Sequence, residues 1–175
     1  MKKILLGILI CSIFISGCGN KLSFSDESNK DVYEHVAEND LDSYIYEAKK
    51  FIMNEDYKNA IKSAEKAIKM DPKSFEAYNL RGLAYAGLEK YDSALENFNK
   101  AIEINPKFFK AYNNRGSVYS ELKKYELAIK EFNKVIEISP NEPDAWYNRG
   151  RCYKLLGNDK KADSDFKKAK ELGFK

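Results

Sequence analysis

The sequence predicts an all-α fold in which antiparallel helix pairs stack side by side, and three observations lead to this prediction. After residue 40 the chain repeats itself every 34 residues without a gap. Prolines recur at one place in the repeat, and a proline ends a helix because it lacks an N–H and restricts the residue before it. Small and aromatic residues recur at the spacing of one helix face. Such a pair buries its apolar face only against its neighbours, so we expect an α-solenoid.

The repeat becomes visible when residues 34 positions apart are aligned. One column is aromatic at every position, and others hold small residues, a second aromatic residue or proline. These columns contain Tyr44, Tyr78, Tyr112, Trp146; Ala48, Gly82, Gly116, Gly150; Phe51, Tyr85, Tyr119, Tyr153; Ala60, Ala94, Ala128, Ala162; and Pro72, Pro106, Pro140. They define about four units, which cover residues 41–74, 75–108, 109–142 and 143–175.

Each unit is expected to contain a first helix, a tight turn and a second helix. The turns are predicted near Glu89, Lys123 and Gly157. The prolines predict that the second helices end near three residues, namely Met70, Ile104 and Ile138. The last helix carries one narrow apolar stripe on an otherwise charged sequence, which is typical of a terminal, capping repeat.

Residues 1–17 have the order of a secretory signal peptide, in which a basic head precedes an apolar run and small residues. As a helix, the stretch Ile4–Gly17 would be about 21 Å long, short of the ~30 Å hydrocarbon core of a bilayer. The residues Ile15-Ser16-Gly17-Cys18 resemble the bacterial lipobox. This resemblance implies cleavage before Cys18, whose thiol then carries a thioether-linked diacylglycerol and whose new amino group carries a further acyl chain, such as palmitate. An ordinary signal peptide with a chance cysteine is the alternative.

Polar residues dominate the segment 18–40, which we interpret as a tether between the lipid anchor and the repeats. Gly19 follows the predicted lipidation site, where an aspartate would resemble an inner-membrane retention signal. We therefore expect a secreted protein that is lipid-anchored to the cell membrane, and to the outer membrane if the cell has one.

The columns of aromatic, Gly, Tyr, Ala, Phe, Ala and Pro residues resemble the pattern of the tetratricopeptide repeat (TPR) family, and the resemblance covers residues 41–175. It implies a right-handed superhelix whose first helices line a concave ligand groove. The family's inward positions correspond here to Lys49, Asn79, Leu83, Lys110, Asn113, Ser117, Tyr147 and Arg151. Asparagine amides suit an extended peptide, because they both donate and accept hydrogen bonds. A generic polar wall is the alternative interpretation.

Three arginines, Arg81, Arg115 and Arg149, stand where the commonest pattern of the family has leucine. We expect their stems to pack and their guanidinium groups to meet a nearby carboxylate or a carbonyl at a helix end; a basic ladder for an acidic partner is the alternative. The carboxylate clamp of TPR proteins that bind chaperone tails is not expected. Its last two basic positions are occupied by Asp144 and Asn148.

Composition and motifs give no sign of catalysis or of nucleic-acid binding. The net charge is only +3, with 30 basic and 27 acidic residues scattered along the chain. Catalytic and phosphate-binding motifs are missing from the sequence, and the single histidine, His35, cannot build a metal site. Cys152 shares its column with Ala84 and Val118, which predicts a small buried residue. We therefore expect no enzyme activity, no cofactor, no metal and no small-molecule substrate.

These observations together predict a membrane-anchored adaptor of the bacterial cell envelope. The concave groove is expected to bind a peptide or a helix of an envelope protein. The alternative, from a different class, is a structural envelope component that associates with itself.

Overall fold

The structure, a computed structural model, describes residues 40–174, and this part of the chain consists of eight α-helices. They are α3 (Leu41–Met53), α4 (Tyr57–Met70), α5 (Phe75–Gly87), α6 (Tyr91–Ile104), α7 (Phe109–Glu121), α8 (Tyr125–Ile138), α9 (Pro143–Leu155) and α10 (Asp159–Glu171). The predicted all-α fold is confirmed. The predicted signal peptide, Cys18 and the tether as far as residue 39 lie outside the described residues.

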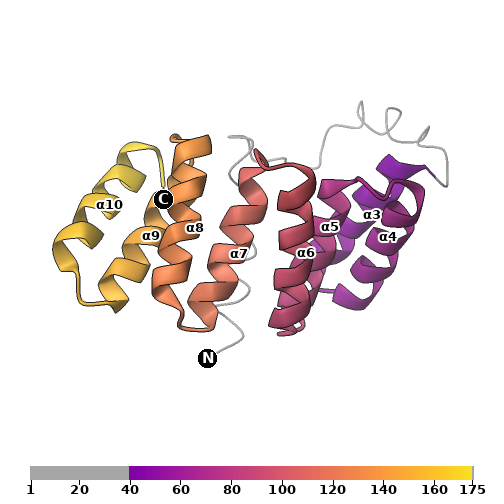
Figure 1. The fold of residues 1–175 in the computed structure, drawn as a ribbon, viewed down its shortest axis with the longest axis horizontal. Helices are drawn as coiled ribbons and strands as arrows, with labels where there is room; N and C mark the ends of the chain where they lie inside the picture. Colours follow the sequence, from indigo (N-terminus) through magenta and orange to yellow (C-terminus); the bar gives the residue numbers. More distant parts are fainter. Residues whose placement is uncertain (1–39, 175) are drawn as a thin grey trace, which may run out of the picture.

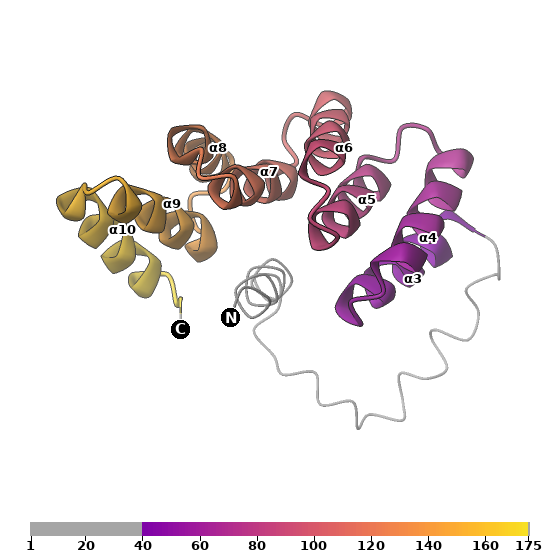
Figure 2. The ribbon, with the colours of Figure 1, turned by 90° about the horizontal axis from the view of Figure 1, so that it is seen from below.

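The helices pack as successive pairs, α3 with α4, α5 with α6, α7 with α8 and α9 with α10, and the pairs stand in chain order (Figure 1). Viewed from below, the row bends into an arc (Figure 2). Helices α5 and α7 lie toward the inner side of this arc, and α6 and α8 lie toward its outer side. The first helix of a pair therefore faces the concave side, where a ligand groove is expected.

The helices end where the sequence predicts. Helices α4, α6 and α8 end at Met70, Ile104 and Ile138, as the prolines indicated. The first helix of every pair is followed by a residue in the left-handed region, namely Glu55, Glu89, Lys123 and Gly157, with φ between 57° and 75°. At one of these turns the Lys124 N–H donates to the Tyr119 carbonyl over 2.8 Å, which satisfies a carbonyl at the end of α7.

Replacing Lys123 by glycine should stabilise the protein. The left-handed conformation at φ 58° costs a non-glycine residue about 1–2 kcal/mol, whereas glycine loses about 0.5–1 kcal/mol more backbone entropy on folding. The difference favours Lys123→Gly by about 0.5 kcal/mol, measured as the free energy of unfolding in urea. The matched control Lys130→Gly, at an exposed position inside α8, should instead destabilise by about 1 kcal/mol. Equal losses for both variants would contradict the argument.

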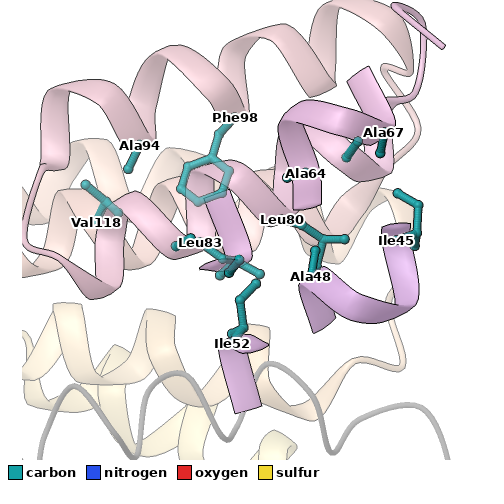
Figure 3. Close-up of a cluster of buried hydrophobic side chains, with 13 residues drawn as sticks. Ile45, Ala48, Ile52, Ala64, Ala67, Leu80, Leu83, Ala94, Phe98 and Val118 are labelled. Carbon is teal, nitrogen blue, oxygen red and sulfur yellow. The ribbon is translucent and has the colours of Figure 1, made fainter. Parts of the chain in front are cut away.

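The core depends on small residues that let the two helices of a pair approach closely. Phe98 of α6 is fully buried, and a Cβ atom added at Gly82 of α5 would lie 2.6 Å from its Cε1 atom. The first unit differs, because Ala48 and Ala64 stand in the columns of Gly82 and Phe98, and both are fully buried in the same cluster (Figure 3). A larger residue on the first helix thus accompanies a smaller residue on the second.

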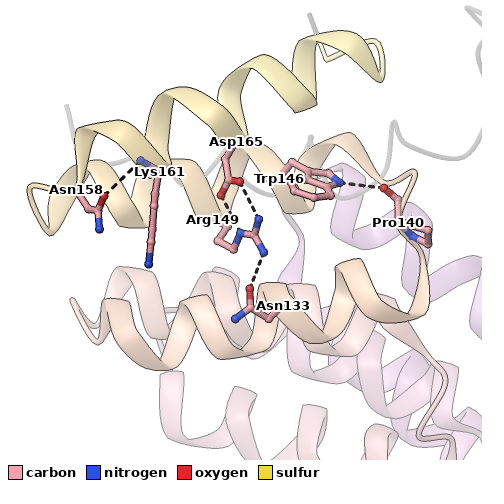
Figure 4. A network of polar contacts seen from close by, with 7 residues as sticks. All are labelled: Asn133, Pro140, Trp146, Arg149, Asn158, Lys161 and Asp165. Carbon is pink, nitrogen blue, oxygen red and sulfur yellow. Dashed lines mark hydrogen bonds and ion pairs between the residues drawn. The ribbon is translucent and has the colours of Figure 1, made fainter.

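The three arginines join each helix pair to the pair before it. The Arg149 guanidinium donates to both carboxylate oxygens of Asp165 in α10, over 2.8 Å each, and to Asn133 Oδ1 in α8 over 2.7 Å (Figure 4). Arg115 repeats the arrangement with Glu131 in its own pair and Asn99 in the preceding one. The expectation that these arginines meet nearby carboxylates is confirmed for both. We call these contacts the arginine bridges.

The second unit carries a weaker version of the arginine bridge. The Arg81 Nε donates to Asn97 Oδ1 over 2.7 Å, and the carboxylate of Glu65 in the preceding pair lies 4.0 Å from Nη1. Each guanidinium also lies beside the aromatic residue three positions earlier, with a carbon-to-centroid distance of 4.7 Å for Arg149 and Trp146. The arginine bridges therefore add polar contacts between successive pairs to their apolar packing.

Candidate functional site

The concave face contains a pocket of about 210 Å³ between the first helices of all four units. Its walls combine apolar side chains with amides and charged groups from four different helices and the connections between them. The lining residues are Lys49, Glu76, Asn79, Leu80, Leu83, Phe108, Phe109, Lys110, Asn113, Val135, Glu142, Asp144 and Ala145. Because the pocket draws on every unit, its shape depends on how the pairs are stacked.

Five of the eight predicted groove residues line this pocket, namely Lys49, Asn79, Leu83, Lys110 and Asn113. The other three lie elsewhere. Ser117 is buried in α7, and Arg151 of α9 is partly exposed outside the pocket. The Tyr147 ring packs within the last unit, where it stacks on Phe174 with the ring centroids 4.0 Å apart.

Sequence reasoning missed several residues that line the pocket, including much of its apolar wall. Phe108 and Glu142 precede α7 and α9 as their N-caps, and Val135 comes from the second helix α8. The prediction considered only inward positions of first helices, so connections and second helices were left out. The 34-residue alignment does place Phe108 and Glu142 in one column with Ser74, and that column marks the rim of the groove.

Buried amides link the groove walls of two units and leave other polar atoms unpaired. The Asn114 Nδ2 in α7 donates to Asn79 Oδ1 in α5 over 2.8 Å. In the described part of the chain, three buried acceptors have no hydrogen-bond partner, namely Asn113 Oδ1, Asn114 Oδ1 and Ser117 Oγ. An unpaired buried polar group costs about 1–3 kcal/mol. Of these three residues Asn113 lines the pocket, so its Oδ1 atom is the one that lies beside a ligand bringing hydrogen-bond donors.

The charged groups of the pocket are of two kinds. Lys49 Nζ and Glu76 Oε1 form an ion pair at 2.6 Å, which neutralises one end. At the other end, burial and the neighbouring charge of Glu142 raise the pKa of Asp144 to about 6. Asp144 lies in the first turn of α9, where the helix dipole favours a negative charge.

The raised pKa of Asp144 should make stability depend on pH. The folded state holds a proton that the unfolded state releases between about pH 4 and pH 6, so stability falls as the pH rises through this window. Asp144→Asn removes this effect. At pH 7.5 we expect the variant to be more stable by about 1 kcal/mol, since partial exposure of the carboxylate weakens the effect. At pH 4 the two proteins should be equally stable in urea titrations.

A matched control for this measurement is Asp92→Asn, because Asp92 is an exposed aspartate in the first turn of α6. Loss of its favourable interaction with the helix dipole should lower stability slightly at pH 7.5. A stability gain at pH 7.5 for Asp92→Asn, or none for Asp144→Asn, would contradict the assignment.

Other candidate sites in the described residues offer little chemistry. Cys152 is buried, as predicted, and burial raises the pKa of its thiol while Ser120 Oγ lies 3.8 Å from its sulfur. Residues 40–174 contain no group of three or more His, Cys, Asp or Glu side chains able to hold a metal ion. Within the same residues, none of the helices has the length and apolar character needed to cross a membrane.

Comparisons with known proteins agree with this geometry. Sequence profiles described as "Tetratricopeptide repeat" match residues 54–74, 75–108, 97–130 and 143–173, and one described as "TPR repeat" matches residues 116–157. Together they cover residues 54–173. Among curated protein sequences, no match was found.

Solved structures share the fold. A crystal structure of MamA is 28% identical, with a TM-score of 0.69, and the match covers 77% of this chain and 78% of MamA. MamA from Desulfovibrio magneticus RS-1 is 23% identical with a TM-score of 0.67, over 77% of this chain and 76% of that one, and shows the fold alone. The first TPR of Spaghetti (RPAP3), bound to the HSP90 peptide SRMEEVD, is 28% identical with a TM-score of 0.64. The match covers 70% of this chain and 98% of that one.

Proposed function

This chain belongs to the tetratricopeptide repeat family, and we propose that it is an adaptor that binds a peptide or a helix of a partner protein in its concave groove. One observation carries the proposal. The concave pocket brings together apolar side chains and the buried, unpaired Oδ1 atom of Asn113. Such a surface suits recognition of a polypeptide segment, whose backbone supplies donors and whose side chains fill apolar space. The peptide bound to the TPR of Spaghetti supports the same mode of binding.

We further propose that the adaptor works at the membrane of the cell envelope, anchored through acyl chains on Cys18. Two or more acyl chains give a stable anchor, whereas one is marginal. Anchoring raises the effective concentration of membrane partners, so modest affinity in the groove would suffice. Replacing Cys18 by alanine should abolish incorporation of labelled palmitate in cells. Labelling that persists in this variant would exclude Cys18 as the anchor.

The groove proposal is tested by photocrosslinking in living cells. Lys110 is exposed at the rim of the pocket, so a photoreactive residue there reaches the groove without disturbing the core. Lys160, which is exposed on α10, serves as the control position. We expect a discrete adduct from position 110 and none from position 160. Equal adducts at both positions, or no adduct at position 110, would contradict binding in the groove.

Self-association as a structural component is the second candidate. Leu155 and Leu156 are exposed at the end of α9, by 55% and 42%, and could contact another copy. Sedimentation velocity of the full chain separates the two candidates. A monomer whose partner binding depends on the groove excludes the structural role, whereas a stable oligomer in which the groove variants behave normally favours it.

A further inference from the structure

We propose that the concave pocket is a subsite for one positively charged side chain, a lysine or arginine of the bound segment, whose cation meets the carboxylate of Asp144. The inference rests on the proposed function, because it specifies the chemistry of the residue that enters the groove. Three properties of the pocket lead to it: its size, the charge of Asp144 and the unpaired amide of Asn113.

The pocket has the size and the walls for one long side chain. Its volume of about 210 Å³ is below the ~300–1,000 Å³ typical of sites for drug-sized ligands. Apolar side chains form much of the wall, including Leu80, Leu83 and Phe108. Lysine and arginine bury their aliphatic stems against such surfaces while the charged end reaches a polar group.

The carboxylate of Asp144 lacks a compensating positive charge. In the described part of the chain it forms neither a hydrogen bond nor an ion pair, and the charge that acts on its pKa is that of Glu142, of the same sign. Five charged groups line the pocket: Lys49, Glu76, Lys110, Glu142 and Asp144. Lys49 is held by Glu76, and Lys110 forms no ion pair with Asp144. A cation from a ligand would therefore supply what the pocket lacks.

The side chain of Asn113 gives a second, independent indication. This residue is 8% exposed and lines the same pocket, and its Oδ1 atom has no hydrogen-bond partner in the described residues. Ammonium and guanidinium groups are donors only, with three and five N–H bonds respectively. Asn113 of α7 and Asp144 of α9 both line the pocket, so a cationic group there has an acceptor on each of two helices. A carboxylate in the same place would meet two acceptors and be repelled.

The test uses the full chain and a set of fluorescent peptides. A short host peptide of serine, alanine and leucine carries one central guest residue, which is arginine, lysine, citrulline, norleucine or glutamate. Citrulline has nearly the shape of arginine without its charge. Dissociation constants come from fluorescence anisotropy at pH 7.5. We expect arginine and lysine guests to bind about tenfold more tightly than citrulline, as a charge-assisted hydrogen bond predicts.

Two variants make the result specific to Asp144. Asp144→Asn should remove the preference for the cationic guests, whereas the exposed control Asp92→Asn should keep the preference. If the citrulline or glutamate guest binds as tightly as arginine, or the preference survives in Asp144→Asn, the basic subsite is excluded and groove binding stands. If no guest binds at all, the proposed groove function is contradicted together with the subsite.

Discussion

Phe98→Ala should lower the free energy of unfolding by about 3–5 kcal/mol, a large part of the stability of a domain of this size. Phe98 is fully buried in the cluster that joins the first two units (Figure 3). Removal of its ring takes away apolar contacts and leaves a cavity that rigid helices on both sides cannot close. The loss would be measured by urea denaturation followed by circular dichroism.

A second substitution makes this prediction sharper. The effect of Gly82→Ala on the free energy of unfolding should change sign when Phe98 is also replaced by alanine. In the wild type the new methyl group would lie 2.6 Å from Phe98, and overpacking of about 1–3 kcal/mol outweighs the ~1 kcal/mol gained from a better helix former. In the Phe98→Ala background the methyl group enters the cavity, so Gly82→Ala should stabilise by about 1 kcal/mol. The double variant would then have the same residues as the first unit, where Ala48 and Ala64 stand at the positions of Gly82 and Phe98.

The first unit also supplies the control for this double-mutant cycle. Ala48→Gly removes a buried methyl group in the unit that has no phenylalanine at the position of Phe98. Ala64 occupies that position in the first unit. It should therefore destabilise by about 1 kcal/mol through lost packing and helix propensity. Additive effects of Gly82→Ala and Phe98→Ala would show that the glycine is not required by the ring.

Asp165→Ala should destabilise the last helix pair by about 3 kcal/mol. The side chain of Asp165 is 6% exposed, and it accepts two hydrogen bonds from Arg149, whose side chain is 16% exposed. Removing one partner of a buried ion pair leaves the other charge without compensation, which costs about 3–5 kcal/mol. We expect a loss at the lower end of this range, because part of the Arg149 guanidinium reaches solvent and keeps its hydrogen bond to Asn133.

Three companion variants identify the cause of this loss. Asp165→Asn should cost only about 1 kcal/mol, because the second unit has an asparagine there and Arg81 bonds to its oxygen. Asp163→Ala, at an exposed position of α10, should change stability by less than about 0.5 kcal/mol. Arg149→Met combined with Asp165→Ala should cost less than Asp165→Ala alone plus Arg149→Met alone. Additivity would mean that the arginine bridge contributes nothing beyond its separate side chains.

The sequence predicted the helix pairs well because one local pattern determines them. The prolines alone located the ends of α4, α6 and α8 at Met70, Ile104 and Ile138. The turns at Glu89 and Lys123 were predicted from the spacing between columns, although only the structure shows that these residues adopt positive φ. These features depend on residues within one unit, and the 34-residue period repeats them.

The groove was less predictable, because its contents depend on how neighbouring units are stacked. Inward positions of single helices suggested Asn79 and Asn113, which line the pocket, but not the hydrogen bond between Asn79 and Asn114 of the next unit. The apolar contribution of Phe108 and Val135 arises only when α7 and α8 meet the neighbouring pairs. The second partner of each arginine, in the preceding pair, was missed for the same reason.

The arginine bridges also have a consequence for how the chain folds. Each bridge joins residues 16 positions apart within a unit and reaches only to the pair made just before it. Contacts of such short sequence separation favour rapid folding that can begin in one pair and spread to its neighbour. Once one pair has formed, the next pair can therefore pack on a surface that is already in place. During this process about one helix pair at a time exposes an apolar face that is not yet covered. The small exposed apolar surface limits aggregation.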